Sequence, residues 1–234
     1  MPSVNDRRAE WFVPAFGPLK FRIAIGLLFL PYTAMVLAFT VIGAMPAPRI
    51  FWNRVAALAL IYFFGLGIAA HALDALGGTG VKPWGTHFTR RQLWTAALFA
   101  LIVAYGIGAY YIVSVVPFLG IIAVLEGFFL LAYNLEWWGG WFHTDRVFAF
   151  SWGVLPTLAG FVMQTNRLSM SALILAMAMG AISLVEINAS RPYKALRRSG
   201  EVSPHGARFE AILKNVSLGV ILLATGLMLW RWSS

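Results

Sequence analysis

The chain has 234 residues, of which 60% are hydrophobic and only 12% are charged, and its mean hydropathy is +0.75. This composition excludes an ordinary soluble domain and predicts a polytopic membrane protein. The net charge of +9 is interpreted as Lys and Arg in loops that meet anionic lipid headgroups, so no nucleic-acid partner is expected, and the absence of cysteine excludes disulfides and thiolate metal sites.

Long continuous apolar runs predict an all-α bundle of about seven transmembrane helices, because a barrel would show short alternating segments instead. We expect one integral membrane domain over residues 1–234, without a cleaved signal peptide. The expected spans are 21–44, 51–76, 92–113, 118–135, 147–163, 168–187 and 211–230. Pro31 predicts a kink in the first span, and Pro156 lies within the fifth.

The distribution of Lys and Arg predicts how the bundle is oriented. Basic residues are dense in the N-terminal segment and in the loops after the second and sixth spans, whereas the loop after the fifth span has only Arg167. We therefore expect the N-terminus in the cytoplasm and the protein in the cytoplasmic (inner) membrane. Arg49 and Arg54, in the loop after the first span, argue weakly for the other orientation.

Ionisable and polar side chains gather at those ends of the apolar spans that this orientation places on the cytoplasmic side. His71 and Asp74 end the second span and are three residues apart, on one helix face. The other members are Tyr133, Asn134, Glu136, His143, Asp145, Glu186, Asn188 and Arg191. A carboxylate at membrane depth is costly and usually has a partner or a function. We expect these residues to converge on one polar chamber that opens to the cytoplasm.

Several of these side chains are candidate metal ligands. They are His71, Asp74, Glu136, His143, Asp145 and Glu186. Carboxylates suit Mg²⁺, whereas two histidines with carboxylates suit zinc or iron. Structural roles are the alternative: the His71–Asp74 pair can tether the second span to a neighbour, and Asp145 can cap the fifth. Glu126, inside the fourth span, can be satisfied by a Tyr or Ser of another helix or can bind a substrate.

The order of these motifs resembles the UbiA superfamily of intramembrane prenyltransferases over roughly residues 21–198. AAHALDALGG stands where that family has its first Asp-rich motif, and Lys82-Pro83 resembles the Arg-Pro pair that follows it. AYNLEWWGG stands at the family's Tyr motif, and LVEINASRPYKALRR stands at its second Asp-rich motif. The chain has fewer carboxylates in both Asp-rich motifs than the family, and only one span follows its basic loop.

The resemblance implies a transferase that, with Mg²⁺, binds the diphosphate of an isoprenoid or similar lipid and transfers the isoprenoid to an acceptor. The candidate catalytic residues are then Asp74, Glu136 and Tyr133. The candidate substrate-binding residues are Asn134, Lys82, Arg146, Asn188, Arg191 and Lys194. The expected partners are a lipid-like substrate and membrane lipids. Two alternatives stay open: a zinc- or iron-dependent membrane enzyme that acts on a lipid, and a non-catalytic membrane subunit or carrier with a UbiA-like fold.

Overall fold

The computed structural model describes residues 10–77, 87–199 and 204–233, and the regular structure of these residues is all helical. The elements are α1 (Leu19–Leu28), α2 (Leu30–Ala44), α3 (Trp52–Tyr62), η2 (Phe63–Ala70), α4 (His71–Leu76), α5 (Arg90–Ser114), α6 (Leu119–Asn134), α7 (Trp137–Gly140), α8 (Asp145–Ala149), η3 (Phe150–Val154), α9 (Leu155–Thr165), α10 (Met170–Ser199) and α11 (Pro204–Ser233). Here η2 and η3 are π-helical turns that continue the helices on either side of them.

Every expected span is helical, but the span count is lower than the sequence predicts. Within the described residues, five continuous helices are long and apolar enough to cross a membrane, and there are six if the bent pair α1–α2 is one span. The remaining apolar helix, α6, has 16 residues, which is about 24 Å of helix and shorter than a typical hydrocarbon core. The helices are consistent with an integral membrane protein, and the count of seven spans is not confirmed.

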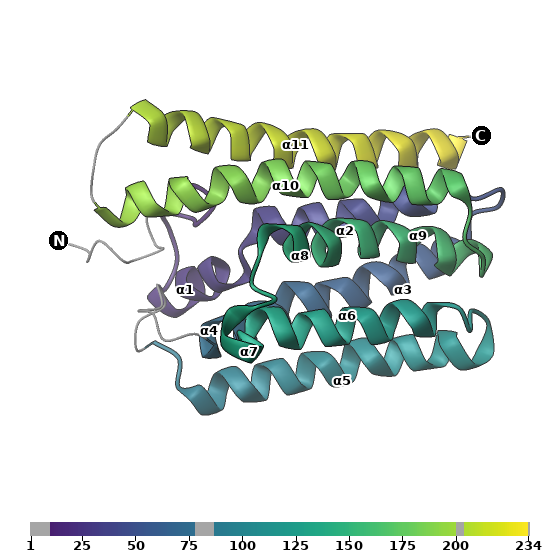
Figure 1. Cartoon of the computed structure of the whole chain (residues 1–234), viewed down its shortest axis with the longest axis horizontal. Helices are drawn as coiled ribbons and strands as arrows, with labels where there is room; N and C mark the ends of the chain where they lie inside the picture. The colour runs from purple at the N-terminus through teal and green to yellow at the C-terminus, as the bar shows by residue number, and fades with distance from the viewer. Residues whose placement is uncertain (1–9, 78–86, 200–203, 234) are drawn as a thin grey trace.

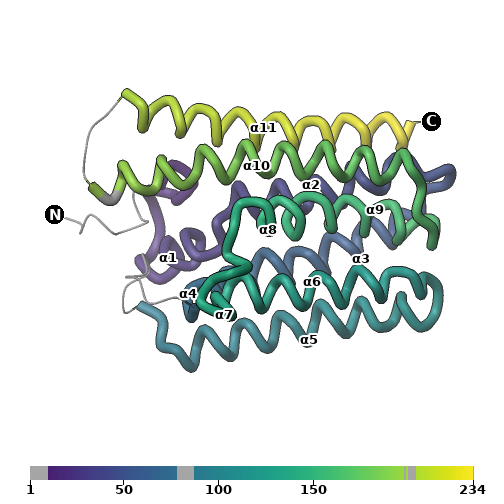
Figure 2. Tube along the Cα trace, viewed as in Figure 1, coloured from purple at the N-terminus to yellow at the C-terminus, as the bar shows by residue number. Residues whose placement is uncertain are grey.

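The helices lie side by side along one long axis (Figure 1 and Figure 2). Helices α10 and α11 run along one side, α5 and α6 along the other, and α2, α3 and α9 lie between them. In the continuous helix from α8 to α9, 89% of the most apolar stretch is buried inside the bundle. In α5 and in α11, only 22% of the corresponding stretch is buried. The outer faces of α5 and α11 are therefore apolar and exposed, as expected for surfaces that face lipid.

The centre of the bundle is held by a close approach of α2 to α9. A Cβ atom added at Gly43 would collide with the carbonyl oxygen of Thr157, and one added at Gly160 would collide with that of Thr40. Small residues at such positions let two membrane helices come into backbone contact, which maximises packing where no hydrophobic force acts between them.

Two prolines interrupt the rods in different ways. The kink that Pro31 predicts is present: Phe29 has φ 45° and ψ 57°, and α1 and α2 are bent by 44° at this point. Pro156 lies just after η3, and its rod continues without a comparable break. A wider π turn before a proline accommodates the carbonyl with which the proline ring would otherwise clash.

Because the rods alternate in direction, the predicted polar clusters fall at one end of the bundle. We call this the polar end: α4, α6 and α10 finish there, and α5, α8 and α11 begin there (left in Figure 1). At the opposite end, α2 and α9 finish and α3 and α10 begin.

Candidate functional site

The polar end is organised around the buried side chain of Tyr133, near the end of α6. Arg191 on α10, Asp74 and Asp145 are close enough to the Tyr133 side chain to act on it electrostatically. The Nε atom of Arg191 is 2.8 Å from Oδ1 of Asp145. These four residues, from α4, α6, α8 and α10, form what we call the Tyr133 cluster.

A glycine brings Asp74 to this cluster. Gly77 follows α4 directly, and a Cβ atom there would collide with the carbonyl oxygen of Asn134 at the end of α6. The end of α4 therefore touches the backbone of α6, one residue beyond Tyr133. Asp74 is three residues before this contact, so the close approach places its carboxylate near the Tyr133 hydroxyl.

His143 packs on the other side of Tyr133. The two rings are stacked with centroids 4.3 Å apart and an interplanar angle of 20°. The Nδ1 atom of His143 is 3.1 Å from the carbonyl oxygen of Tyr133, and because a carbonyl only accepts, Nδ1 carries the proton in this contact. The Nε2 atom of a neutral His143 is then an acceptor or a ligand.

The start of α8 shows why Asp145 is available to this cluster. Thr144, and not Asp145, is the N-cap, since its hydroxyl accepts a hydrogen bond from the backbone N–H of Val147 at 3.3 Å. Asp145 occupies the first turn, where the helix dipole favours a carboxylate, and its side chain pairs with Arg191. Asp145 therefore does not cap the helix itself, as the structural alternative for it expects, but it does lie in the first turn.

Buried aromatic side chains separate the polar end from the apolar centre. Phe148 stacks on Trp152, with centroids 5.3 Å apart, and Phe29 lies 4.2 Å from Tyr32. Phe148 connects the two pairs, because its ring lies 6.2 Å from that of Tyr32. We call Phe29, Tyr32, Phe148 and Trp152 the aromatic wall. Sequence reasoning missed it, although the spacing of Phe148 and Trp152 by four residues is a helical-face signal.

His71 and Lys194 both lie against the aromatic wall. The His71 ring is 5.3 Å from that of Trp152, and its Nε2 atom is 3.5 Å from the hydroxyl of Thr33. The Lys194 ammonium stands 4.7 Å from the ring centre of Phe29 and 5.4 Å from that of Tyr32. The faces of these two rings thus already accept a cation.

Glu186 is buried on the inner face of α10, two turns before Lys194, which acts on its carboxyl electrostatically. Ser183 and Ser190 share that face and are also buried. Among the described residues, Oε1 of Glu186 and the two hydroxyls have no hydrogen-bond partner. The chain therefore has a polar row inside the bundle that sequence reasoning recognised only at Glu186.

The remaining predicted site residues lie apart from the Tyr133 cluster. The Asn134 side chain donates to the carbonyl of Leu130 at 2.8 Å, so it is used within its own helix. Arg146 and Asn188 are exposed, and Lys82 lies outside the described residues. The side chain of Glu136 forms no hydrogen bond or ion pair with any described residue.

Glu136 is set apart by the backbone around it. The sequence predicts a helix break at Gly139-Gly140, but α6 already ends at Asn134, and Glu136 is left-handed with φ 52°. Trp138, Gly139 and Gly140 also have positive φ, so α7 is irregular. Because of this turn, Glu136 does not continue the helical face of α6, although its predicted place in the site depends on that continuation.

No group of three or more His, Asp and Glu side chains within residues 10–77, 87–199 and 204–233 is arranged to hold a metal ion. The six candidate ligands are instead divided between the Tyr133 cluster, the aromatic wall, the polar row and Glu136. Asp74 and Asp145 remain carboxylates of the kind that suits Mg²⁺, which is commonly held by one or two carboxylates together with substrate phosphates. A zinc or iron site of several protein ligands remains a prediction without such support.

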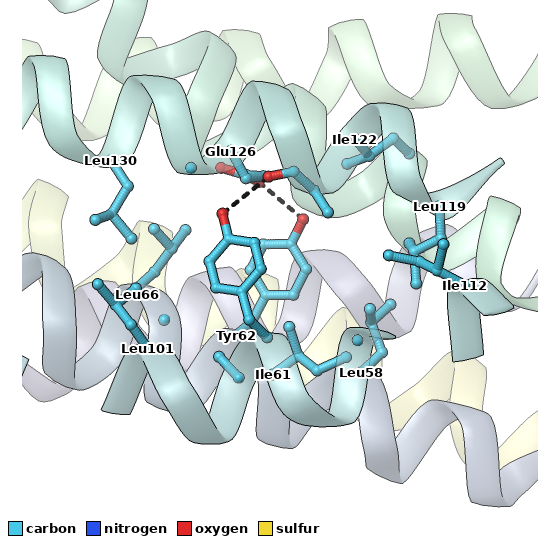
Figure 3. Close-up of a pocket in the computed structure, with 16 residues that line it drawn as sticks. Leu58, Ile61, Tyr62, Leu66, Leu101, Ile112, Leu119, Ile122, Glu126 and Leu130 are labelled. Atoms are coloured by element: carbon cyan, nitrogen blue, oxygen red, sulfur yellow. Dashed lines mark hydrogen bonds between the residues drawn. The ribbon is translucent and has the colours of Figure 1, made fainter. Parts of the chain in front are cut away.

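An apolar cavity of about 70 Å³ lies between α3, η2, α5 and α6 (Figure 3). The hydroxyl of Tyr62 donates to Oε1 of Glu126 at 2.8 Å, which confirms a tyrosine of another span as its partner, whereas Oε2 is buried without a hydrogen-bond partner among the described residues. Leu130, which lines one end of the cavity, is three residues from Tyr133 on α6. Tyr105, also in the lining, is 42% exposed on the outer surface, so the cavity lies between that surface and the polar end.

Comparisons of the chain with protein-family models, with curated proteins and with solved structures found no match. The resemblance to the UbiA superfamily therefore remains a prediction from the order of the sequence motifs.

Proposed function

We propose that the protein is an intramembrane transferase that acts, with Mg²⁺, on an isoprenoid or similar lipid diphosphate. In this proposal it has a UbiA-like bundle of seven spans, with α1–α2 and α6 each counted as one, and its polar end faces the cytoplasm. The observation that carries the proposal is the Tyr133 cluster, in which an arginine and two carboxylates from three helices lie near a buried tyrosine at the polar end of an apolar bundle.

The charges near the cluster suit a diphosphate. Arg191 and Lys194 are three residues apart on α10, so both can reach one ligand. A guanidinium binds two phosphate oxygens at once, and an ammonium adds a point charge. Asp74 and Asp145 would hold Mg²⁺, whose positive charge would stabilise the leaving diphosphate. The ion pair between Arg191 and Asp145 would then describe the protein without ligand, and it would open so that Arg191 binds the diphosphate and Asp145 binds Mg²⁺.

The aromatic wall suits the other product of ionisation. In the proposed reaction, the allylic C–O bond breaks, and both electrons leave with the diphosphate. The acceptor forms a bond to the allylic carbon and loses a proton. Once Lys194 leaves the rings of Phe29 and Tyr32 for the diphosphate, these two faces would stabilise the intermediate positive charge by cation–π attraction, which is strongest where water is excluded.

The cavity beside Glu126 supports a substrate with an apolar tail. Its walls are almost wholly aliphatic, and it lies one helical turn below Tyr133. A diphosphate held by Arg191 would therefore have an apolar space within reach of its chain. Glu126 is engaged by Tyr62 and has no role in the chemistry that we propose.

Binding of geranylgeranyl diphosphate to the purified full chain in nanodiscs would test this proposal, with geranylgeraniol as the uncharged comparison. We expect Mg²⁺-dependent binding that prefers the diphosphate. Arg191→Gln should weaken it about tenfold or more, because a charge-assisted bidentate contact is lost. Arg208→Gln, the same change at an exposed site on α11, is the matched control. Equal binding of the diphosphate and the alcohol would refute the proposal and favour a non-catalytic role.

A further inference from the structure

The end of the bundle opposite the polar end carries an unbalanced group of arginines. Arg49 and Arg54 lie between α2 and the first turn of α3, and Arg167 lies between α9 and α10. Among the described residues, no Asp or Glu lies in the segments that form this end, and none of the three forms an ion pair. Because arginines are usually sparse in loops on the non-cytoplasmic side, their presence there needs a reason.

Arg54 has a structural reason. Its Nη1 atom donates to the carbonyls of Met163 and Gln164, at 3.2 and 3.3 Å, and so satisfies the carbonyl end of α9. Its guanidinium also stacks 4.1 Å from the ring centre of Phe51. The Arg49 guanidinium lies 5.0 Å from the same ring centre, but neither it nor that of Arg167 donates to a backbone carbonyl of a described residue.

Arg49 and Arg167 instead line a common cavity of about 390 Å³. Gln164 lines it as well and is only 5% exposed. The Oε1 atom of Gln164 accepts a hydrogen bond from the backbone N–H of Phe51 at 2.7 Å, which fixes the orientation of the amide. Its Nε2 atom is buried and has no hydrogen-bond partner among the described residues. A buried donor of this kind indicates a missing acceptor.

The start of α10 adds to the same electrostatic environment. Ser169 lines the cavity, and its hydroxyl accepts from the backbone N–H of Ala172 at 3.1 Å, so it caps this 30-residue helix. The N-terminus of a helix carries partial positive charge and attracts anions. Two guanidinium groups, one amide donor and a helix N-terminus therefore meet at one cavity.

We propose that this cavity binds the phosphate group of an anionic membrane lipid. Apart from Thr165, whose hydroxyl donates to the carbonyls of Phe161 and Arg167, the rest of its lining is apolar, and Leu168 is 45% exposed at the surface of the bundle. A free phosphate would leave these apolar walls uncovered, whereas the glycerol and the first acyl carbons of a lipid would cover them. This site shares no residue with the Tyr133 cluster, and the inference does not depend on the proposed transferase.

Native mass spectrometry of the full chain in detergent tests this inference, with dioleoyl phosphatidylglycerol and dioleoyl phosphatidylcholine as probes. We expect phosphatidylglycerol to bind about tenfold more tightly than phosphatidylcholine. The double variant Arg49→Gln/Arg167→Gln should abolish this preference. Arg208→Gln, a matched change at an exposed site on α11, should keep it.

Gln164→Glu is a second variant that keeps the acceptor for the Phe51 N–H and replaces only the unpartnered donor with a negative oxygen. We expect it to lower phosphatidylglycerol binding to the level of phosphatidylcholine. Equal binding of the two lipids to the unmodified protein, or an equal loss in Arg208→Gln, would overturn the proposal. Competition by inorganic phosphate at concentrations near that of the lipid would overturn the lipid as the source of the phosphate.

Discussion

Gly77→Ala should loosen the polar end because it separates two backbones. The dihedral angles of Gly77, φ −77° and ψ 169°, are open to any residue, so backbone conformation does not require glycine here. The requirement is steric: an added Cβ would collide with the carbonyl oxygen of Asn134 and would lie 3.0 Å from its carbonyl carbon and from Cα of Leu135. These atoms are backbone, so no rotamer change can relieve the contact.

The size of the effect follows from this geometry. The end of α4 must move away from α6 by on the order of 1 Å, and overpacking of this kind costs about 1–3 kcal/mol. Asp74 moves with α4, so its approach to Tyr133 is loosened as well. Gly219→Ala, on α11, is the matched control, because nothing lies within 4 Å of a Cβ added there.

Two measurements separate the stability effect from the site effect. Reversible unfolding in SDS-containing micelles should show a loss for Gly77→Ala of about 1–3 kcal/mol and no loss for Gly219→Ala. Mg²⁺-dependent binding of geranylgeranyl diphosphate should weaken in the Gly77 variant under conditions in which it remains folded. A Gly77→Ala protein as stable as the unmodified chain would show that the ends of α4 and α6 are not in backbone contact.

Three further perturbations address other parts of the bundle. Gly108→Val should fill the cavity beside Glu126 and weaken binding of geranylgeranyl diphosphate several-fold more than that of dimethylallyl diphosphate, whereas Gly106→Val, on the exposed face of α5, should change neither. Tyr62→Phe should destabilise the protein by about 1–3 kcal/mol in the same unfolding assay, and Glu126→Leu added to it should restore part of the loss, because a carboxyl without its donor costs more than an apolar pair. Because the chain has no cysteine, Arg208→Cys and Arg167→Cys each introduce a unique thiol, and a membrane-impermeant maleimide should label only Arg167→Cys from outside intact cells.

Much of the helical arrangement follows from the sequence because the bilayer sets the length of an apolar helix. The apolar runs predict each rod, and Pro31 predicts the bend. The bend itself falls at Phe29, two residues earlier, because the ring of Pro31 conflicts with the backbone of the preceding turn. The bounds expected for the fourth span, 118–135, agree with α6 to within one residue at each end, but the left-handed turn at Glu136 was not predicted.

The site was predicted less completely, because the direction of a side chain depends on helical register. The expected catalytic and metal residues include Asp74, Tyr133 and Asp145, which lie near one another, but also Glu136 and Glu186, which lie apart from them. Spacing along one helix identifies residues on a shared face, as for His71 and Asp74. It does not identify partners on other helices, and a π-helical turn such as η2 rotates every later side chain relative to an α-helical count.

The arginines at the end opposite the polar end have local contacts, so they count less than other basic residues when the orientation of the bundle is predicted. Arg49 and Arg54 argue against a cytoplasmic N-terminus when loop charges are counted, but Arg54 is held by the carbonyl end of α9 and Arg49 lines a cavity. Arg231, near the end of α11, donates to the carbonyl of Ala47 at 2.7 Å, so the loop that contains Arg49 is itself bound to the bundle. Charges with such local roles are retained for structure or binding. The basic residues near the end of α10 and the start of α11, such as Arg197 and Arg208, are therefore the better indicators of the cytoplasmic side.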